Sequence, residues 1–187
     1  MKSSYHALPL IRLLPCPKFI SVKKSLHGVM ENRLIHHCLD VICGPLKEAS
    51  IWGAFMGDSI GYIRCFFTPI VAYIVDTPEA AVIARVGGKT SHFMLASHKH
   101  FGDHFRHLTC LATLTLSQIE HLSEDIDPWG LELYAKQSHL RFRLNSVHLP
   151  FWHNWTLLDG TITEPSQFLT PKPLHHWHKQ FWDHNVK

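Results

Sequence analysis

The first side chains that could do chemistry are carboxylates beside a run of β-branched and aromatic residues. Asp76 follows the run Tyr62–Val75, and Glu79 comes three residues later. A carboxylate at the carboxyl end of a buried strand is a common ligand of the Mg²⁺ ions that assist phosphodiester chemistry. The same Asp-x-x-Glu spacing is also that of a capping box, in which Asp76 only begins a helix. Asp58 lies in a Gly-Asp-Ser stretch and is expected to form a turn.

Histidine is the unusual residue type of this chain, with 17 copies against 18 Lys and Arg together. The densest group lies between residues 92 and 107. Imidazoles spaced by four and three residues share one face of a helix and can bind Zn²⁺ there. Hydrogen-bonded or solvated histidines are the alternative, because no C-x-x-C or H-E-x-x-H motif accompanies them. The candidate zinc ligands are His98, His100, His104 and His107.

Positive charge gathers loosely in the first third of the chain, although the formal net charge is only +3 with histidine neutral. Such a group could contact DNA, but it is weaker than the basic stripe of dedicated nucleic-acid binders, and a solvated face is the alternative. Near residues 175–184, imidazoles alternate with Trp177, Phe181 and Trp182, and they could stack on bases or pack in a core. The candidate DNA contacts are Lys23, Lys24, Arg33, Arg141 and Arg143.

The elements that must position these side chains follow from hydrophobic periodicity. Helical spacing runs from residue 29 to 43, and Gly44-Pro45 then predicts a stop followed by a restart. A short apolar run at 54–56, a turn and the run 62–75 predict a strand hairpin whose second strand is long and buried. Pro69 indicates a bulge or an edge position in that strand. A helix is expected directly after Asp76.

The later residues are expected to be mostly helical, with helices at 115–125 and 131–144 and an aromatic, irregular stretch at 147–171. Strands before helices predict a mixed α/β (α+β) fold. We expect an irregular segment at 1–28, a core at 29–145 and an aromatic, His-rich segment at 146–187.

Composition excludes several classes of protein. Hydrophobic residues make up 45% of the chain and charged residues 18%, which suits a packed core and not a disordered chain. The five cysteines are odd in number and lack C-x-x-C spacing, which favours reduced thiols inside the cell. The longest apolar run, Cys65–Val75, is shorter than the roughly 20 residues of a membrane span, so no membrane partner is expected.

The block YIVDTPEAAVIARVGGKTSH resembles Plavaka-type transposases, which are fungal DNA-transposon proteins of the Kyakuja–Dileera–Zisupton group. Their pattern is a Gly-Asp turn, a long strand, tyrosine, two residues, Asp, one residue and Pro-Glu. The sequence supplies Gly57-Asp58, Tyr73, Asp76, Pro78 and Glu79. The resemblance continues in HKHFGDHFRH (98–107), DPWGL (127–131), RFRLNSVHLPFWHNW (141–155) and PSQFLTPKPLHHWHKQFWDH (165–184).

The resemblance implies an RNase H-like core that uses three carboxylates and Mg²⁺ to cut and join DNA strands. Asp76 matches the second of these carboxylates. DNA would be the partner and the nucleus the location.

The sequence departs from the family pattern in three places. No convincing first carboxylate precedes Asp58, and the third would fall beyond residue 187. Gly87–His92 replaces the cysteine pair that many relatives carry after the second carboxylate. We therefore expect a truncated or decayed transposase-derived protein without strand-transfer activity on its own, because one carboxylate cannot hold a two-metal site. A His-rich zinc-binding module and a non-catalytic DNA-contacting remnant remain as alternatives.

Overall fold

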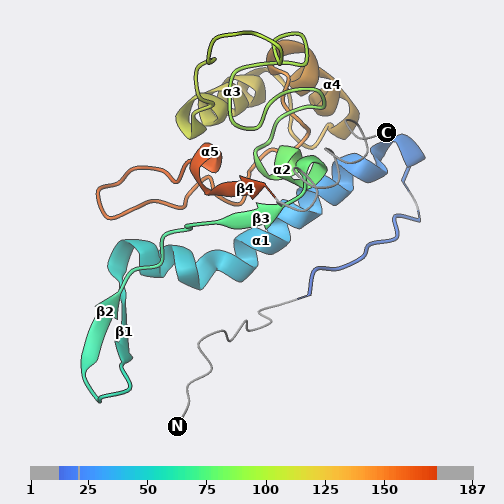
Figure 1. The fold of residues 1–187 in the computed structure, drawn as a ribbon. Coiled ribbons are helices and arrows are strands. Elements are labelled where there is room, and N and C mark those ends of the chain that lie inside the picture. Colours follow the sequence, from blue (N-terminus) through green and yellow to red (C-terminus); the bar gives the residue numbers. More distant parts are fainter. Residues whose placement is uncertain (1–12, 21, 172–187) are drawn as a thin grey trace, which may run out of the picture.

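The computed structural model describes residues 13–20 and 22–171 (Figure 1). Its mixture of helices and small sheets confirms the predicted α+β class. Residues 1–12 of the predicted irregular segment and the base-stacking candidates at 175–184 lie outside the described residues, and the predicted domain boundaries stay predictions.

In chain order the elements are η1 (Lys24–Leu26), α1 (His27–Trp52), β1 (Ala54–Gly57), β2 (Ile63–Phe66), β3 (Tyr73–Val75), α2 (Thr77–Ile83), α3 (Ala112–Asp125), α4 (Leu131–Phe142), α5 (Pro165–Phe168) and β4 (Leu169–Pro171).

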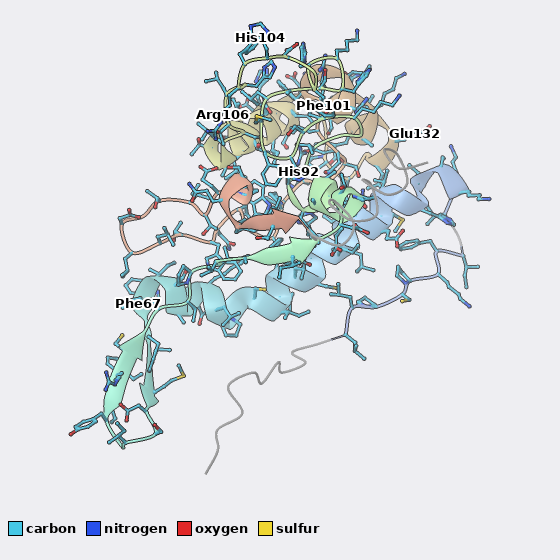
Figure 2. All side chains as sticks on the ribbon, in the orientation of Figure 1. Phe67, His92, Phe101, His104, Arg106 and Glu132 are labelled. Atoms are coloured by element: carbon cyan, nitrogen blue, oxygen red, sulfur yellow. The ribbon has the colours of Figure 1, made fainter. Side chains whose placement is uncertain are left out.

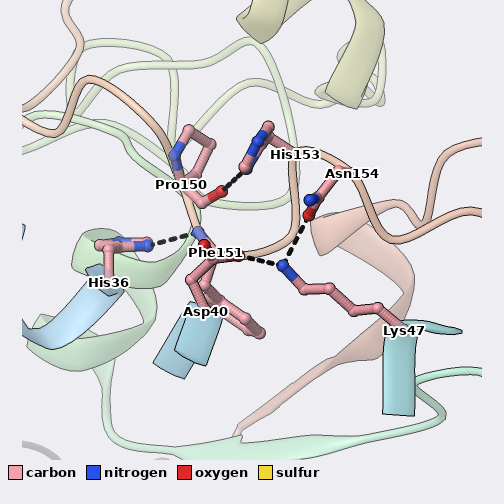
Figure 3. Close-up of polar contacts among 7 residues, drawn as sticks. All are labelled: His36, Asp40, Lys47, Pro150, Phe151, His153 and Asn154. Atoms are coloured by element: carbon pink, nitrogen blue, oxygen red, sulfur yellow. Dashed lines mark hydrogen bonds and ion pairs between the residues drawn. The ribbon is translucent and has the colours of Figure 1, made fainter. Parts of the chain in front are cut away.

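Helix α1 is continuous, so the stop predicted at Gly44-Pro45 is wrong. A proline inside a helix removes one backbone hydrogen bond, but tertiary contacts beyond it hold the last turns in place. The Lys47 Nζ atom donates to Asn154 Oδ1 at 2.6 Å, as Figure 3 shows, and the Ser50 hydroxyl donates to the carbonyl of Thr156 at 2.8 Å. The buried polar face of α1 thus fixes the helix against the later aromatic segment.

The predicted hairpin is confirmed, because β1 and β2 pair antiparallel. The prediction that the second strand is long and buried is wrong, because β2 ends at Phe66 and is exposed along its length. The chain forms a separate strand, β3, only from Tyr73. Pro69 lies between β2 and β3 and has no N–H to donate to a strand ladder. Beyond it β3 pairs in parallel with β4 instead, with Tyr73 opposite Leu169. The RNase H-like core stays a prediction, since the described strands form two separate two-stranded sheets.

The main core lies where α1, α2, β3 and the aromatic segment after α4 meet. Trp152 is fully buried, and its indole N–H donates to the carbonyl of Ile83 at 2.7 Å, which ties this segment to the end of α2. The buried members of this core are Leu39, Val75, Ala80, Ile83, Ala84, Val86, Ala112, Phe151, Trp152, Trp155, Phe168 and Leu169.

Helices α3 and α4 confirm the two helices predicted after residue 111, although α3 begins at Ala112, before the expected start. They pack on each other through Leu122, Ile126 and Tyr134. Between α2 and α3 runs a long loop, residues 88–111, which we call the 88–111 loop. Backbone bridges between Thr90 and Ser97 and between Met94 and Thr109 cross it.

All five cysteines are free thiols. Among residues 13–20 and 22–171, no helix combines the length and the apolar character needed to cross a bilayer.

Candidate functional site

Asp76 caps a helix in this structure. It lies between β3 and α2 in an extended conformation, and its Oδ1 atom accepts the backbone N–H of Glu79 at 3.2 Å. The Glu79 carboxylate does not reach back to close the capping box but accepts the hydroxyl of Tyr73 at 3.4 Å. Burial is the main cause that raises the pKa of Tyr73 to about 12, with the Glu79 charge adding to it. Both carboxylates at this junction therefore have local structural partners.

The described residues do not fit a magnesium centre. A two-metal site needs several carboxylates within reach of both ions. Within the part of the chain that the structure describes, no three His, Cys, Asp or Glu side chains are grouped to hold a metal ion. The role of Asp76 as a metal ligand stays a prediction, while its role as a cap is confirmed.

Asp58 is the other acidic candidate, and it organises the turn of the β1–β2 hairpin. Its Oδ1 atom accepts the backbone N–H groups of Ile60 and Tyr62, both at 2.9 Å. Its Oδ2 atom accepts the Arg64 guanidinium at 2.7 Å. The bond from Arg64 is the main cause that holds the pKa of Asp58 below its ordinary value. The prediction of a turn-forming aspartate is confirmed.

The histidine group does not form the helical face that its spacing suggested, because residues 92–107 form turns and bends. The backbone N–H of His98 donates to the carbonyl of Lys89 at 2.8 Å, and that of His100 donates to Ser97 at the same distance. His98, His100 and His104 are exposed, and His107 is half-buried. The helical basis for zinc binding is therefore wrong, although zinc binding itself stays a prediction.

The loop brings a different set of rings together. The ring centroids of His100 and His107 lie 5.4 Å apart, and those of Phe105 and His107 lie 4.9 Å apart. The Nε2 atom of His107 lies 2.8 Å from a carboxylate oxygen of Asp103. His104 packs edge-on against Phe105 at 5.5 Å. A connected group of imidazole and phenyl rings thus lies on the loop.

Three of the five predicted DNA contacts bind other parts of the protein. Arg33 donates to the carbonyl of Ser146 at 2.9 Å, and its guanidinium carbon lies 5.2 Å from the centre of the Tyr134 ring. Arg141 donates to Asp125 at 2.6 Å. Lys23 pairs with Glu132 at 3.6 Å between two exposed side chains.

The other two predicted contacts are exposed. Lys24 begins η1, and Arg143 ends α4 in a left-handed conformation with φ 55°. The backbone carbonyl of Arg143 accepts the N–H of Gly87 at 2.6 Å, which joins α4 to the start of the loop. The two exposed candidates thus lie at the ends of different helices.

Arg85 is a buried cation that the sequence did not reveal. Its side chain is fully buried, its Nε atom donates to the carbonyl of Val147, and its Nη2 atom donates to the hydroxyl of Tyr134 at 3.1 Å. Burial is the main cause that lowers the pKa of Arg85 to about 10. Arg33 lies over the ring of the same tyrosine. The pair of Arg85 and Tyr134 is structural, because both side chains are fully buried.

A cavity of about 510 Å³ opens between α1, the start of α4 and the segment 147–149. Its wall is mostly apolar and includes Trp129 and Arg33. Burial is the main cause that lowers the pKa of His148, which also lines the cavity. These features suit a packing or binding surface and supply no nucleophile with an adjacent base.

Sequence reasoning missed an exposed basic stretch at the tip of the 88–111 loop. Every residue from 98 to 106 is exposed. Figure 2 shows Phe101, His104 and Arg106 on this loop, far from Phe67 at the base of the hairpin. The signal was present in the sequence as alternation of basic and aromatic residues, which is typical of nucleic-acid contacts. The cations of the whole 88–111 loop are Lys89, Lys99 and Arg106, against the single acid Asp103, and Lys99 and Arg106 lie in its tip.

Comparison with known proteins gives a family match. A family model described as Plavaka transposase covers residues 1–187. No curated protein and no solved structure matches the chain.

Proposed function

The chain belongs to the Plavaka transposase family, and from this premise we propose that it is a transposase-derived protein that binds DNA without cutting or joining strands on its own. DNA is the substrate of a transposase, so the family supplies the partner. A nuclear location follows from that partner and is part of the proposal.

The observation that carries DNA binding is the basic, exposed tip of the 88–111 loop. Lys99 and Arg106 belong to its exposed stretch, and no carboxylate within residues 13–20 and 22–171 forms an ion pair with either of them. Cations that are not neutralised by the protein are available to phosphates, and each phosphate contact releases counterions from DNA. By contrast, Arg33 of the earlier set donates to the carbonyl of Ser146, and Arg141 pairs with Asp125.

The proposed lack of strand transfer rests on the junction at Asp76. A phosphodiester cleavage site of this class needs several carboxylates around its metal ions. Asp76 accepts a backbone N–H, and its neighbour Glu79 accepts the Tyr73 hydroxyl. The expectation that the chain is a truncated or decayed copy stays a prediction. The reading frames on both sides of the gene test it, since it requires them to encode other transposase segments.

A salt titration of duplex binding tests the proposed function. The double variant Lys99→Gln/Arg106→Gln should weaken duplex binding and make the plot of log K against log salt shallower by about 2, at about 0.9 for each phosphate that is no longer neutralised. The matched control is Lys23→Gln/Lys24→Gln, which removes the same charge from η1 and should change the slope less. Absence of salt-dependent binding by the unaltered protein, or equal slopes in both double variants, would contradict the proposal.

Zinc binding, predicted for His98, His100, His104 and His107, remains the second candidate function, although no three His, Cys, Asp or Glu side chains of the described residues are grouped to hold a metal ion. Metal analysis after purification in metal-free buffer tests it. A content near one equivalent of Zn²⁺ that falls in the variant His100→Ala/His107→Ala supports this function, and less than about one-tenth equivalent excludes it.

A further inference from the structure

We propose that the loop tip, residues 98–107, binds unpaired DNA bases by stacking them on Phe101 and Phe105. This inference rests on the proposed function and names the form of DNA that the same loop recognises. A base inside a duplex is covered by its neighbours on both faces, whereas an unpaired base can place a face against an aromatic side chain.

The first observation is the exposure of both phenyl rings. Phe101 is 59% exposed and Phe105 is 57% exposed, although phenylalanine is among the residues that are most often buried. They lie four residues apart in a segment whose other members are mostly basic or imidazole side chains. Both rings are therefore open to a planar ligand on the same loop tip.

The second observation is that the ring group is already ordered in the protein. Phe105 contacts the imidazoles of His104 at 5.5 Å and His107 at 4.9 Å, and His107 contacts His100 at 5.4 Å. A ring that is held by its neighbours loses less conformational freedom when a base stacks on it. The contacts therefore prepare Phe105 for a planar ligand.

The third observation is that hydrogen bonds hold the turns of the loop tip. The buried Ser97 hydroxyl lies 3.2 Å from Nδ1 of His100, and the His107 imidazole lies 2.8 Å from Asp103. The backbone N–H of Asp103 donates to the carbonyl of His100 at 3.2 Å. These bonds connect the two ends of the tip, so the rings sit on a supported turn.

The fourth observation is charge complementarity. Lys99 and Arg106 flank the phenyl positions, and the 88–111 loop carries three cations and one acid. Single-strand binders combine a positive surface that follows the phosphates with aromatic rings that take the bases. Both parts are present on this one loop, which makes single-stranded DNA a better ligand here than an apolar peptide.

The experiment measures the binding of the full chain and its variants to two fluorescent DNA probes. One probe is an oligo(dT) strand of about 12 nucleotides, a length within the site sizes of single-strand binders. The other probe is a duplex of the same length. The test variant is Phe101→Leu/Phe105→Leu, which keeps apolar volume but removes both π faces. The control is Phe55→Leu, which makes the same change at a phenylalanine that is 77% exposed and lies in β1, outside the loop. We expect the double variant to bind oligo(dT) at least about fivefold more weakly, with duplex affinity and the control unchanged.

The outcomes separate this inference from the proposed function. One outcome would overturn base stacking and leave the proposed function standing. In it, duplex binding depends on salt, but the affinity for oligo(dT) does not change when Phe101 and Phe105 are replaced. Equal losses in the Phe55 control and the double variant would overturn it as well. Failure of the unaltered protein to bind either probe at low salt would overturn both.

Discussion

The Nδ1 atom of His36 accepts the backbone N–H of Phe151 at 3.0 Å, across 115 residues of sequence, while its Nε2 atom lies 2.9 Å from the carbonyl of Val82. Figure 3 shows the bond between His36 and Phe151. His36 is 1% exposed, and its imidazole joins α1, α2 and the aromatic segment. Since one ring nitrogen accepts and the other faces a carbonyl, the neutral ring with a proton on Nε2 satisfies both bonds.

This arrangement predicts acid sensitivity. Burial is the main cause that lowers the pKa of His36 from 6.5 to about 4. Between these values the unfolded chain binds more protons than the folded chain, so the stability from neutral His36 is complete above pH 6.5 and is lost as the pH falls to about 4. The loss should reach about 3 kcal/mol in the free energy of unfolding. Urea unfolding at several pH values in this range measures it.

The variant His36→Gln tests the assignment to this side chain. Glutamine keeps a donor and an acceptor but does not titrate, so the free energy of unfolding should fall less steeply between pH 6.5 and pH 4. His121→Gln serves as a control because the His121 side chain is 64% exposed. A slope in His36→Gln that equals the slope of the unaltered protein would show that other groups cause the acid sensitivity.

The hydroxyl of Tyr134 supports the buried guanidinium of Arg85. It accepts Nη2 of Arg85 at 3.1 Å, and Tyr134 is fully buried. Tyr134→Phe keeps the ring under Arg33 but leaves a buried donor without its partner, which costs about 1–3 kcal/mol. Thermal and urea unfolding should show this loss. Tyr62→Phe, at a 65% exposed site, should leave the stability unchanged, and equal effects of the two changes would refute the role of the Arg85 bond.

Local signals made parts of this structure predictable. The helix after Asp76 and the turn at Asp58 were both foreseen, because capping and turn chemistry depend on side chains within a few residues. The continuation of α1 through Pro45 and the parallel pairing of β3 with β4 were not foreseen. Both depend on contacts with the segment after residue 150, which no local pattern contains.

The sequence pointed to residues 98–107 as a candidate site but did not predict which of their side chains lie together. The histidines at 98–107 were singled out by their density, but their spacing suggested a helix, which Gly102 within the run disfavours. The loop instead places His107 beside both Phe105 and His100. Which rings meet in a loop depends on its backbone turns, so the ring group could not be derived from periodicity.

The carboxylate of Asp58 should control the order of the β1–β2 hairpin. It accepts two backbone N–H groups and the Arg64 guanidinium, and both strands are largely exposed and receive little support from the core. Asp58→Ala should therefore speed amide hydrogen exchange in residues 54–66 while the melting temperature of the whole protein changes little. Asp159→Ala, which removes a similar turn bond to Thr161, is the matched control. Unchanged exchange in the hairpin of Asp58→Ala would contradict the role of this carboxylate.

Two substitutions at Asp76 distinguish a helix cap from a metal ligand. Asp76→Ala removes the acceptor for the Glu79 N–H and should lower the free energy of unfolding by about 1 kcal/mol. Asp76→Asn keeps an oxygen acceptor, so its stability should stay close to that of the unaltered protein. Unfolding with and without millimolar MgCl₂ measures both effects. If Asn proves as costly as Ala, or if Mg²⁺ stabilises only the protein with Asp76, the negative charge matters beyond the cap, because a metal ion needs that charge and a backbone N–H does not.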